Sequence, residues 1–538
     1  MKAYGRFFTI GNVCFLWFKY SISWLFIALD YVGSKKVCME IRFSRSALAR
    51  DGGVPHNNVL PDPPPSRASA LLRVLHSQVY QDMSRLPKIK LRSAATLVPV
   101  TFKLPDTATA PFCPSAVTDS VSIPANASLA RKMLLFVGPG LLVSIGYMDP
   151  GNWATAIEAG SRFGYALLFV VVLASLSGMV LQNLCSRLGI ATGRDLAQLS
   201  ASRYSARVAK GQWLLAELSI IATDLAEVLG AALAFHLLLG VSITTGVALT
   251  AFDTLIVLAL QGANFRRLEA IVLGLIATIG ACFTVELILI KPFWPDVAAG
   301  LKPSWDVLSS QEPLYIAIGI LGATVMPHNL YLHSSVVQTR VNGSDNVHKA
   351  SAIKFARIDT IASLSLALLI NAAILILAAA AFHKSGHTDV VEIQDAYHLL
   401  DPLVGGAVAS VLFGIALLAA GQSSTFTGTI AGQVVLEGFL QAKIPCWQRR
   451  LITRALALIP ALIGVIWLGD SSVGKMLVLS QVVLSLQLPF ALWPLIRFTS
   501  DRQLMGPFVN SRLVKTVAWG LFGLISAANL MLLWFWVS

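Results

Sequence analysis

Two breaks in long apolar stretches hold the residues best suited to binding an ion. The segment YMDPGN (147–152) places Asp149 before a Pro-Gly pair, and VMPHN (325–329) places Met326 before a proline. Proline and glycine are the residues least compatible with a continuing helix, so each break leaves backbone carbonyls without intrahelical partners. A carboxylate at mid-membrane costs at least about 2.5–3.5 kcal/mol, which makes Asp149 a functional candidate. A cation would bind both the carboxylate and the free carbonyls, whereas a single proline would more often be an ordinary kink.

The donors at the two breaks also indicate the kind of ion. Asp149 and Asn152 supply oxygen donors, which suit hard cations such as Mg²⁺, Ca²⁺ and Mn²⁺. The thioether of Met326 adds nothing for Mg²⁺ or Ca²⁺ but contributes to binding Mn²⁺, Fe²⁺, Co²⁺ and Cd²⁺. A methionine in a membrane helix is usually packing, but a place at the break favours a ligand. Together the two breaks predict a transition-metal site.

A second set of ionisable residues lies in the segment WLLAELSIIATDLAEVLGAALAFH. Glu217, Asp224 and Glu227 are spaced by seven and three, which puts them within about 80° of one another on a helix. Three acids on one face of a membrane helix cannot face lipid, so they face the interior or water. Carboxylates that are buried close together can exchange protons near neutral pH. The alternative is that a neighbouring helix holds these acids only to orient packing.

The composition identifies the elements that must position these residues. Of 538 residues, 55% are hydrophobic and 13% are charged, against roughly 25% charged in soluble domains. From about residue 133 onward, apolar stretches long enough to cross ~30 Å of hydrocarbon follow one another. They lack the alternation of a transmembrane barrel, so we predict an all-α polytopic membrane protein. The predicted spans are 133–160, 163–187, 211–239, 241–262, 268–290, 313–338, 356–382, 403–426, 453–469, 475–497 and 514–536.

Basic residues are concentrated in the connections that follow the even-numbered spans. Those connections hold Arg194, Arg203, Arg207, Lys210, Arg266, Arg267, Arg340, Lys349, Lys354, Lys443, Arg449, Arg450, Arg502 and Arg512, against Arg162, Lys291, Lys302 and Lys384 after odd-numbered spans. This asymmetry predicts a multi-pass protein of the cell (inner) membrane, with a cytoplasmic N-terminus and an extracytoplasmic C-terminus. The net charge of +13 is therefore topological and does not indicate nucleic-acid binding. The six cysteines are scattered, with no disulfide framework or thiolate metal site.

The first 130 residues differ in kind from the rest. Residues 7–33 are apolar but include Lys19, and residues 50–130 are rich in Pro, Ser and Ala, a composition typical of disorder. We expect two parts, an N-terminal extension over 1–130 and a transmembrane transporter domain over 131–538. The extension is expected to be disordered, or else to precede the true start of the protein. In the second case the true start would lie nearer Met83 or Met133.

The two breaks occupy matching places in two groups of five spans. Interrupted helices at corresponding positions of two halves indicate a transport site at the midplane between inverted repeats.

At this point the residues resemble a known family. GPGLLVSIGYMDPGNWATAIEAG (138–160), MPHNLYLHSS (326–335), GQSSTFTGTIAGQVVLEGF (421–439) and SQVVLSLQLPFALWP (480–494) are similar to signature segments of the Nramp family of proton-coupled divalent metal transporters, in its bacterial manganese branch. The resemblance covers roughly residues 130–536. It implies eleven transmembrane helices in a leucine-transporter-like fold, with inverted five-helix repeats and broken helices 1 and 6. It also implies metal ligands from the side chains of Asp149, Asn152 and Met326 and the carbonyls of Gly146 and Ala323, with Gln481 joining as the site occludes.

The resemblance also implies a proton pathway. His328 would join Glu217, Asp224 and Glu227, and Arg454 would pair with this acidic row. Arg449 and Arg450 are expected at the membrane surface as topological charges, and His333 is expected to make structural hydrogen bonds. Asp253, Glu286 and Asp359 lie in or near spans and receive no role.

These observations predict a transporter that imports Mn²⁺ and Fe²⁺, with Cd²⁺ and Co²⁺ as further substrates, together with protons. It would not be an enzyme and would need no cofactor, since metal ions and protons are transported substrates. Its partners would be these ions and the lipid bilayer, without nucleic acid or an obligatory protein partner. A sodium-coupled symporter of organic solutes is the alternative within the same fold. An intramembrane metalloenzyme would need a constellation such as HExxH, and ATP-driven transport a GxxxxGK[ST] loop, and the sequence contains neither.

Overall fold

The computed structural model describes residues 128–251, 265–304, 309–340, 345–390, 392–404, 408–440 and 446–537. All of them belong to one compact unit, Leu104–Ser538. The predicted N-terminal extension therefore lies outside the described residues, except for its last few positions. Within the described ranges every regular element is a helix.

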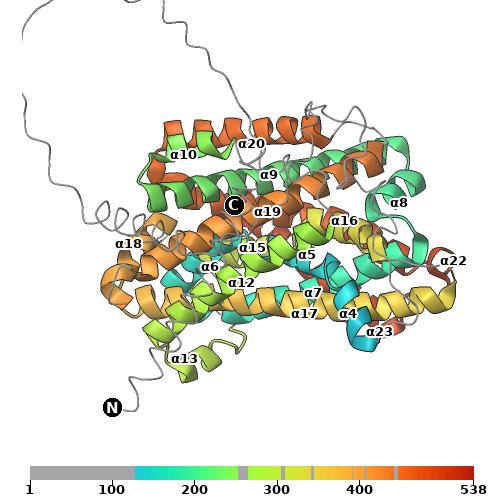
Figure 1. The fold of residues 1–538 in the computed structure, drawn as a ribbon, viewed down its shortest axis with the longest axis horizontal. Coiled ribbons are helices and arrows are strands. Elements are labelled where there is room, and N and C mark those ends of the chain that lie inside the picture. Colours follow the sequence, from blue (N-terminus) through green and yellow to red (C-terminus); the bar gives the residue numbers. More distant parts are fainter. Residues whose placement is uncertain are drawn as a thin grey trace, which may run out of the picture. The chain divides into compact units, whose positions relative to one another are not determined.

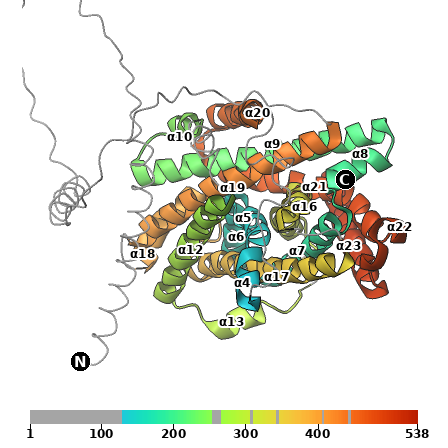
Figure 2. The same ribbon diagram turned by 45° about the vertical axis from the view of Figure 1, so that its right-hand side comes forward.

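The arrangement of the described helices is shown in Figures 1 and 2. Their bounds are α4 Leu129–Phe136, α5 Pro139–Gly146, α6 Pro150–Phe163, α7 Leu168–Thr192, α8 Leu196–Arg203, α9 Ala206–Leu239, α10 Ile243–Thr250, α12 Phe265–Ile290, α13 Trp294–Ala299, α15 Gln311–Thr324, α16 Pro327–Val336, η1 Val337–Arg340, α17 Asn346–Ala378, η2 Ala379–His383, α18 Ile393–Val404, α19 Val408–Leu440, α20 Cys446–Leu468, η3 Asp470–Ser472, α21 Val473–Thr499, α22 Arg502–Met505, η4 Gly506–Phe508 and α23 Arg512–Val537.

The predicted spans are found in this structure. In the part of the chain that the structure describes, nine helices are long and apolar enough to cross a membrane, and they correspond to nine of the eleven predicted spans. The first predicted span is divided into α5 and α6, each too short to cross alone. The fourth, 241–262, is described only as far as residue 251 and begins with α10. The predicted all-α architecture with broken helices 1 and 6 is confirmed.

Both breaks are also helix starts. The second half of the first broken helix begins at Pro150, and the second half of the other begins at Pro327. Proline suits the first turn of a helix, because the N–H that it lacks would have no partner there. Asp149 caps the first of these helices by accepting the backbone N–H of Asn152 at 2.8 Å. The same local rules thus end one helix and begin the next within three residues.

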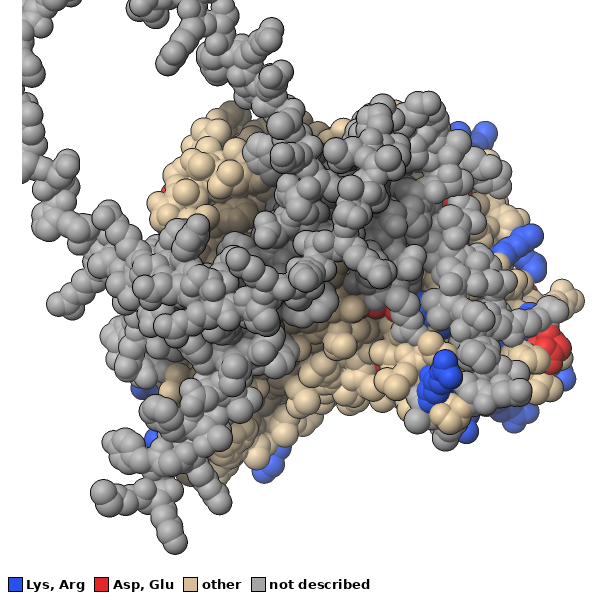
Figure 3. Space-filling model, in the orientation of Figure 1, with Lys and Arg blue, Asp and Glu red and all other residues tan. Residues whose placement is uncertain are grey.

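The broken helices lie at the centre of the bundle. In Figure 2, α5, α6 and α16 lie between α9 and α19 on one side and α7 and α17 on the other. α10 and α20 pack on the outer side of α9, and α23 packs against α21. Large apolar side chains on the outer helices are exposed, as a lipid-facing surface requires, among them Trp467 and Trp534. Basic side chains gather at the end that holds α8 and α22, which is the predicted cytoplasmic end (Figure 3).

Candidate metal site and proton pathway

Asp149 lies in the break between α5 and α6 and is fully buried. Its Oδ1 accepts the backbone N–H of Asn152 at 2.8 Å and the Asn152 side-chain N–H at 2.7 Å. Its Oδ2 has no hydrogen-bond partner among the described residues. A buried oxygen without a partner costs free energy, and this cost is largest for a charged group. The break thus holds one carboxylate oxygen that is free to bind a cation.

Three oxygens from two helices converge on the side chain of Asn152. Its Nδ2 donates to the carbonyl of Ala323 at 2.9 Å and to the carbonyl of Gly146 at 3.3 Å, as well as to Asp149. A cation bound among these oxygens would take the place of the N–H donors. Rotation of the amide by half a turn would then direct the oxygen of Asn152 towards the ion. Four of the six residues predicted as metal ligands are therefore in direct contact.

Met326 lies in the other break, next to Asn329. It is fully buried at the start of α16, beside Ala222 and Leu484. Its sulfur accepts an N–H from Asn329 Nδ2 at 3.6 Å. The same nitrogen lies only 2.2 Å from where a Cβ on Gly146 would stand, so the Asn329 amide separates Met326 from the end of α5. Gly146 leaves the space that this amide occupies.

Gln481 of α21 lies against the same break. It is fully buried, and its Nε2 donates to Ser480 Oγ at 2.9 Å. A Cβ on Gly151 would stand 1.9 Å from that nitrogen, so the Gln481 side chain packs directly on the first turn of α6. The sixth predicted ligand is therefore close to the others, with its Oε1 unpaired among the described residues.

The acidic face of α9 turns inward, as predicted. Asp224 and Glu227 are fully buried, and both face Gly428 of α19, where a Cβ would lie 3.0 Å from Glu227 Oε1 and 3.3 Å from Asp224 Oδ1. His328 reaches this helix through Thr223, whose Oγ1 lies 3.3 Å from His328 Nδ1. The helix that begins at the second break is thus joined to the acidic row.

Two arginines of α20, rather than one, pair with the acidic row. Arg454 Nη1 lies 4.0 Å from Glu227 Oε2, and its Nη2 donates to the Thr250 carbonyl at 3.1 Å. The expectation that Arg449 lies at the membrane surface is wrong. Arg449 is buried, and its Nη2 donates to both oxygens of Glu217, at 2.8 and 3.1 Å.

The physical reason for this correction is that α20 packs against α9, and Arg449 near the start of α20 reaches Glu217 there. From the sequence alone, two adjacent arginines at the end of a predicted span are expected to be cytoplasmic charges that set the orientation of the span. The structure does not describe the side chain of Arg450.

The remaining polar residues in the spans have defined places. The expectation for His333 is confirmed, since its Nδ1 lies 3.0 Å from Gln182 Oε1. Asp359, which received no role, accepts the backbone N–H of Gly140 at 2.7 Å and so caps α5. Glu286 is fully buried, and neither of its oxygens has a hydrogen-bond partner in the described part of the chain. Asp253 lies outside the described residues.

Sequence reasoning missed two asparagines that support the break. Besides Asn329, Asn371 of α17 is buried, and its Nδ2 donates to the carbonyl of Tyr147 at 2.6 Å and lies 3.4 Å from Asn152 Oδ1. Asn371 is an amide within an otherwise apolar stretch, a signal that could have identified it.

The donor set is mixed in kind. In the described ranges, no three His, Cys, Asp or Glu side chains are grouped to hold a metal. Any metal at the breaks would therefore depend on one carboxylate together with amide, thioether and carbonyl donors.

Comparison with known proteins gives a consistent result. The family model described as natural resistance-associated macrophage protein-like, Nramp, matches residues 140–535. A divalent metal cation transporter, MntH 1, of Pseudomonas aeruginosa is 85% identical over 81% of this chain and 99% of the relative. The MntH of Ralstonia nicotianae is 69% identical over 80% of this chain and 98% of the relative.

Solved structures show the same likeness. The manganese transporter of Eremococcus coleocola, crystallised with an aromatic bis-isothiourea compound, has a TM-score of 0.72 and 40% identity, covering 78% of this chain and 90% of that one. Mhp1, a nucleobase-cation-symport-1 family transporter, has a TM-score of 0.52 at 15% identity and shares the fold alone.

Proposed function

This chain belongs to the Nramp family, and on that premise we propose that it imports Mn²⁺ into the cytoplasm together with protons. It is a transporter and not an enzyme, because the proteins of this family to which it is similar are transporters. One observation carries the proposal for the metal. The unpaired, buried Oδ2 of Asp149 lies at a helix break where two carbonyls from different helices converge.

The chemistry of the donors supports manganese and its neighbours. The relatives from Pseudomonas and Ralstonia are described as divalent metal cation transporters, and the Eremococcus protein as a manganese transporter. Carboxylate, amide and carbonyl oxygens bind Mn²⁺ well, and the thioether of Met326 favours Fe²⁺, Co²⁺ and Cd²⁺ over alkaline-earth ions. We therefore propose Fe²⁺, Co²⁺ and Cd²⁺ as further substrates. The metal and the proton are cargo, and no cofactor is proposed.

Proton coupling is supported by the link between the second break and the acidic row. His328 lies two residues after Met326, and it meets α9 at Thr223, the residue before Asp224. A metal that neutralises Asp149 changes the charge balance around this link. Asp224, Glu227 and His328 would then take up or release a proton as the ion binds and leaves. Arg454 and Arg449 would hold the row in place, because an arginine stays protonated in proteins.

The proposed direction of transport and the proposed membrane are supported by the distribution of basic residues. Loops rich in lysine and arginine support a cytoplasmic N-terminus in the inner membrane. The proton gradient across such a membrane runs inward, so coupled metal would be imported. No obligatory protein partner is proposed.

The alternative of a sodium-coupled organic symporter has weaker support. Mhp1 shares the fold, but at 15% sequence identity a shared fold does not indicate a shared substrate. A binding site for an organic substrate would not need a soft sulfur, that of Met326, at one break and a carboxylate, that of Asp149, at the other.

The test is Mn²⁺ uptake into liposomes that contain the purified protein, with an imposed pH gradient and with or without sodium. We expect Mn²⁺ uptake to become faster as the external pH falls and to be independent of sodium. Asp149→Asn keeps a helix-capping side chain but removes the charge, so it should abolish uptake. Asp195→Asn is the matched control, because Asp195 is also a buried helix cap and lies outside the site. Near-normal uptake by Asp149→Asn would refute the site.

Asp224→Asn tests coupling separately. We expect it to bind Mn²⁺ as the natural protein does, while uptake loses its dependence on external pH. An unchanged acceleration on acidification would refute the proton pathway but leave the metal site standing.

A further inference from the structure

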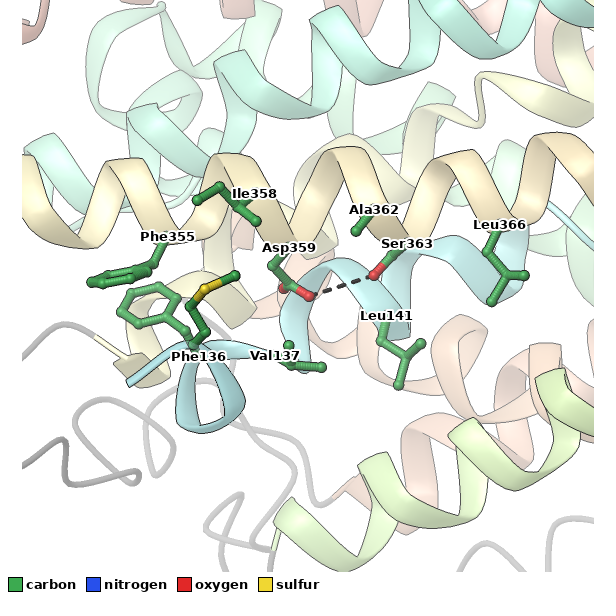
Figure 4. A pocket seen from close by; sticks show the side chains of 10 residues that line it. Phe136, Val137, Leu141, Phe355, Ile358, Asp359, Ala362, Ser363 and Leu366 are labelled. Carbon is green, nitrogen blue, oxygen red and sulfur yellow. Dashed lines mark hydrogen bonds between the residues drawn. The ribbon is translucent and has the colours of Figure 1, made fainter. Parts of the chain in front are cut away.

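A cavity of about 250 Å³ lies between α17 and the junction of α4 with α5 (Figure 4). Its walls are mainly apolar, with Met133, Phe136 and Leu141 on one side and Phe355, Ile358 and Leu366 on the other. The rings of Phe136 and Phe355 lie 5.4 Å apart and close one end, while Leu366 lies at the other. The cavity is separate from the metal site, which lies at the opposite end of α5.

The cavity opens to the outside of the bundle. Met133, Ile358 and Leu366 on its rim are 36%, 39% and 38% exposed. These are apolar side chains on helices at the membrane, so the cavity opens towards lipid and not towards the transport path.

The polar groups in its wall are already paired. Asp359 Oδ2 accepts the N–H of Gly140 at 2.7 Å, and Ser363 Oγ donates to Asp359 Oδ1 at 3.4 Å. A polar ligand would therefore find few free partners in the lining. A hydrocarbon chain would fill the same volume with favourable apolar contacts.

Cationic side chains flank the end that the two rings close. Lys132 precedes Phe136 by one turn of α4, and Lys354 precedes Ile358 by one turn of α17, so each lies on the same helix face as a lining residue. No acid in the described ranges forms an ion pair with either lysine. Lys354 is exposed, and the next residue before Lys132, Arg131, is exposed as well. Long basic side chains reach headgroup phosphates while their stems cover apolar surface.

We propose that this cavity binds one acyl chain of an anionic phospholipid from the cytoplasmic leaflet, with its phosphate held by Lys132 and Lys354. The lipid would join α4 and α5 to α17 across the surface of the bundle. The proposal concerns a binding site distinct from the metal site and stands without the proposed function. If α5 moves during transport, lipid occupancy would favour the arrangement in which it lies against α17.

Native mass spectrometry of the purified full chain tests this proposal. The protein is titrated with phosphatidylglycerol and, separately, with phosphatidylcholine carrying the same acyl chains. We expect the first phosphatidylglycerol to bind at least tenfold more tightly than phosphatidylcholine. Replacing both lysines, in Lys132→Gln with Lys354→Gln, should weaken phosphatidylglycerol binding at that first site by about thirtyfold. Phosphatidylcholine binding should weaken much less, because its choline already balances the charge of its phosphate. Arg512→Gln with Lys515→Gln on α23 is the matched control, because it removes two exposed basic residues of the same predicted membrane face.

A second variant tests the acyl chain. Ala362 lines the cavity and is exposed, so Ala362→Trp fills the volume without entering the core. It should weaken both lipids equally, and Ala362→Leu should do so less. Retained Mn²⁺ uptake and a single peak in gel filtration check that the variants are folded. Equal binding of the two lipids by the natural protein, or a lysine variant that loses no more than the α23 control, overturns the headgroup assignment. Unchanged lipid binding by Ala362→Trp overturns the cavity.

Discussion

The ion pair between Glu217 and Arg449 offers a sharp test of the acidic row. Both side chains are nearly buried, with 12% of the Glu217 side chain and 6% of the Arg449 side chain exposed. Arg449 Nη2 donates hydrogen bonds to both carboxylate oxygens of Glu217, at 2.8 and 3.1 Å. Glu217→Gln removes the negative charge and leaves the guanidinium buried. Removing one partner of a fully buried pair costs about 3–5 kcal/mol. Glutamine can still accept one hydrogen bond from Arg449, so we expect a loss of about 2–3 kcal/mol in the free energy of unfolding.

Two further variants separate the ion pair from other effects. Glu312→Gln breaks a pair with Arg162 that lies 3.5 Å apart and whose acid is 75% exposed. Such a surface pair contributes at most about 1 kcal/mol, so this variant is the matched control. Combining Glu217→Gln with Arg449→Gln removes both charges, and it should recover most of the lost stability.

The measurement is equilibrium unfolding of the purified protein in mixed detergent, followed by tryptophan fluorescence. A double-mutant cycle over the two positions gives the coupling free energy. A stabilising role for the buried ion pair is refuted if Glu217→Gln lowers the free energy of unfolding no more than Glu312→Gln. It is also refuted if the double variant is destabilised by the sum of the two single effects, because the buried charges would then not be coupled.

Three further predictions address selectivity, packing and pH. Met326→Ala should lower Cd²⁺ uptake more than Mn²⁺ uptake and make Ca²⁺ and Mg²⁺ stronger competitors, since these ions need oxygen ligands; competition assays in liposomes that show neither change would mean that Met326 only fills space. Gly189→Ala would place a Cβ 2.1 Å from the backbone oxygen of Ser334, so it should cost about 1–3 kcal/mol on unfolding. Gly274→Ala, where no atom lies within 4 Å, should be neutral or stabilising, and similar losses in both would contradict this view of helix packing. Burial raises the pKa of Glu392 to about 7 from its usual 4.5, against a hydrogen bond from the backbone of Gly474. Its protonated form therefore stabilises the fold below pH 4.5, and this contribution is lost as the pH rises through 7. Glu392→Gln should be less sensitive over pH 5–8 in thermal unfolding, and parallel pH profiles would exclude this role.

Much of the fold follows from local rules that the sequence carries. Hydrocarbon thickness fixes the length of each span, and a proline marks both breaks. At the first break the proline stands between a capping carboxylate and a glycine, and at the second it follows Met326, which makes no side-chain cap. Asp149 is therefore found at a helix start by its neighbours alone. The same holds for the inward face of α9, because three acids spaced by seven and three share one side of any helix. Such features depend on residues within one or two turns of each other.

The pairing of polar groups across the bundle depends on the tertiary structure. Asp359 caps α5 from a helix more than two hundred positions further along, and Arg449 meets Glu217 over a similar separation. The sequence contains both partners in each case, but periodicity gives only the face on which each lies. Which faces meet is decided by how helices pack, and in the membrane small residues and close contacts set that packing.

The proposed metal site shows the same division. The sequence alone was enough to propose Asp149, Asn152 and Met326 as metal donors, because breaks and residue types are local features. Only the tertiary structure brought the carbonyls of Gly146 and Ala323 to one amide and placed Asn329 between the two breaks. Backbone carbonyls are identical in every residue, so no sequence pattern marks the ones that converge. Their position is a property of two helix ends held side by side.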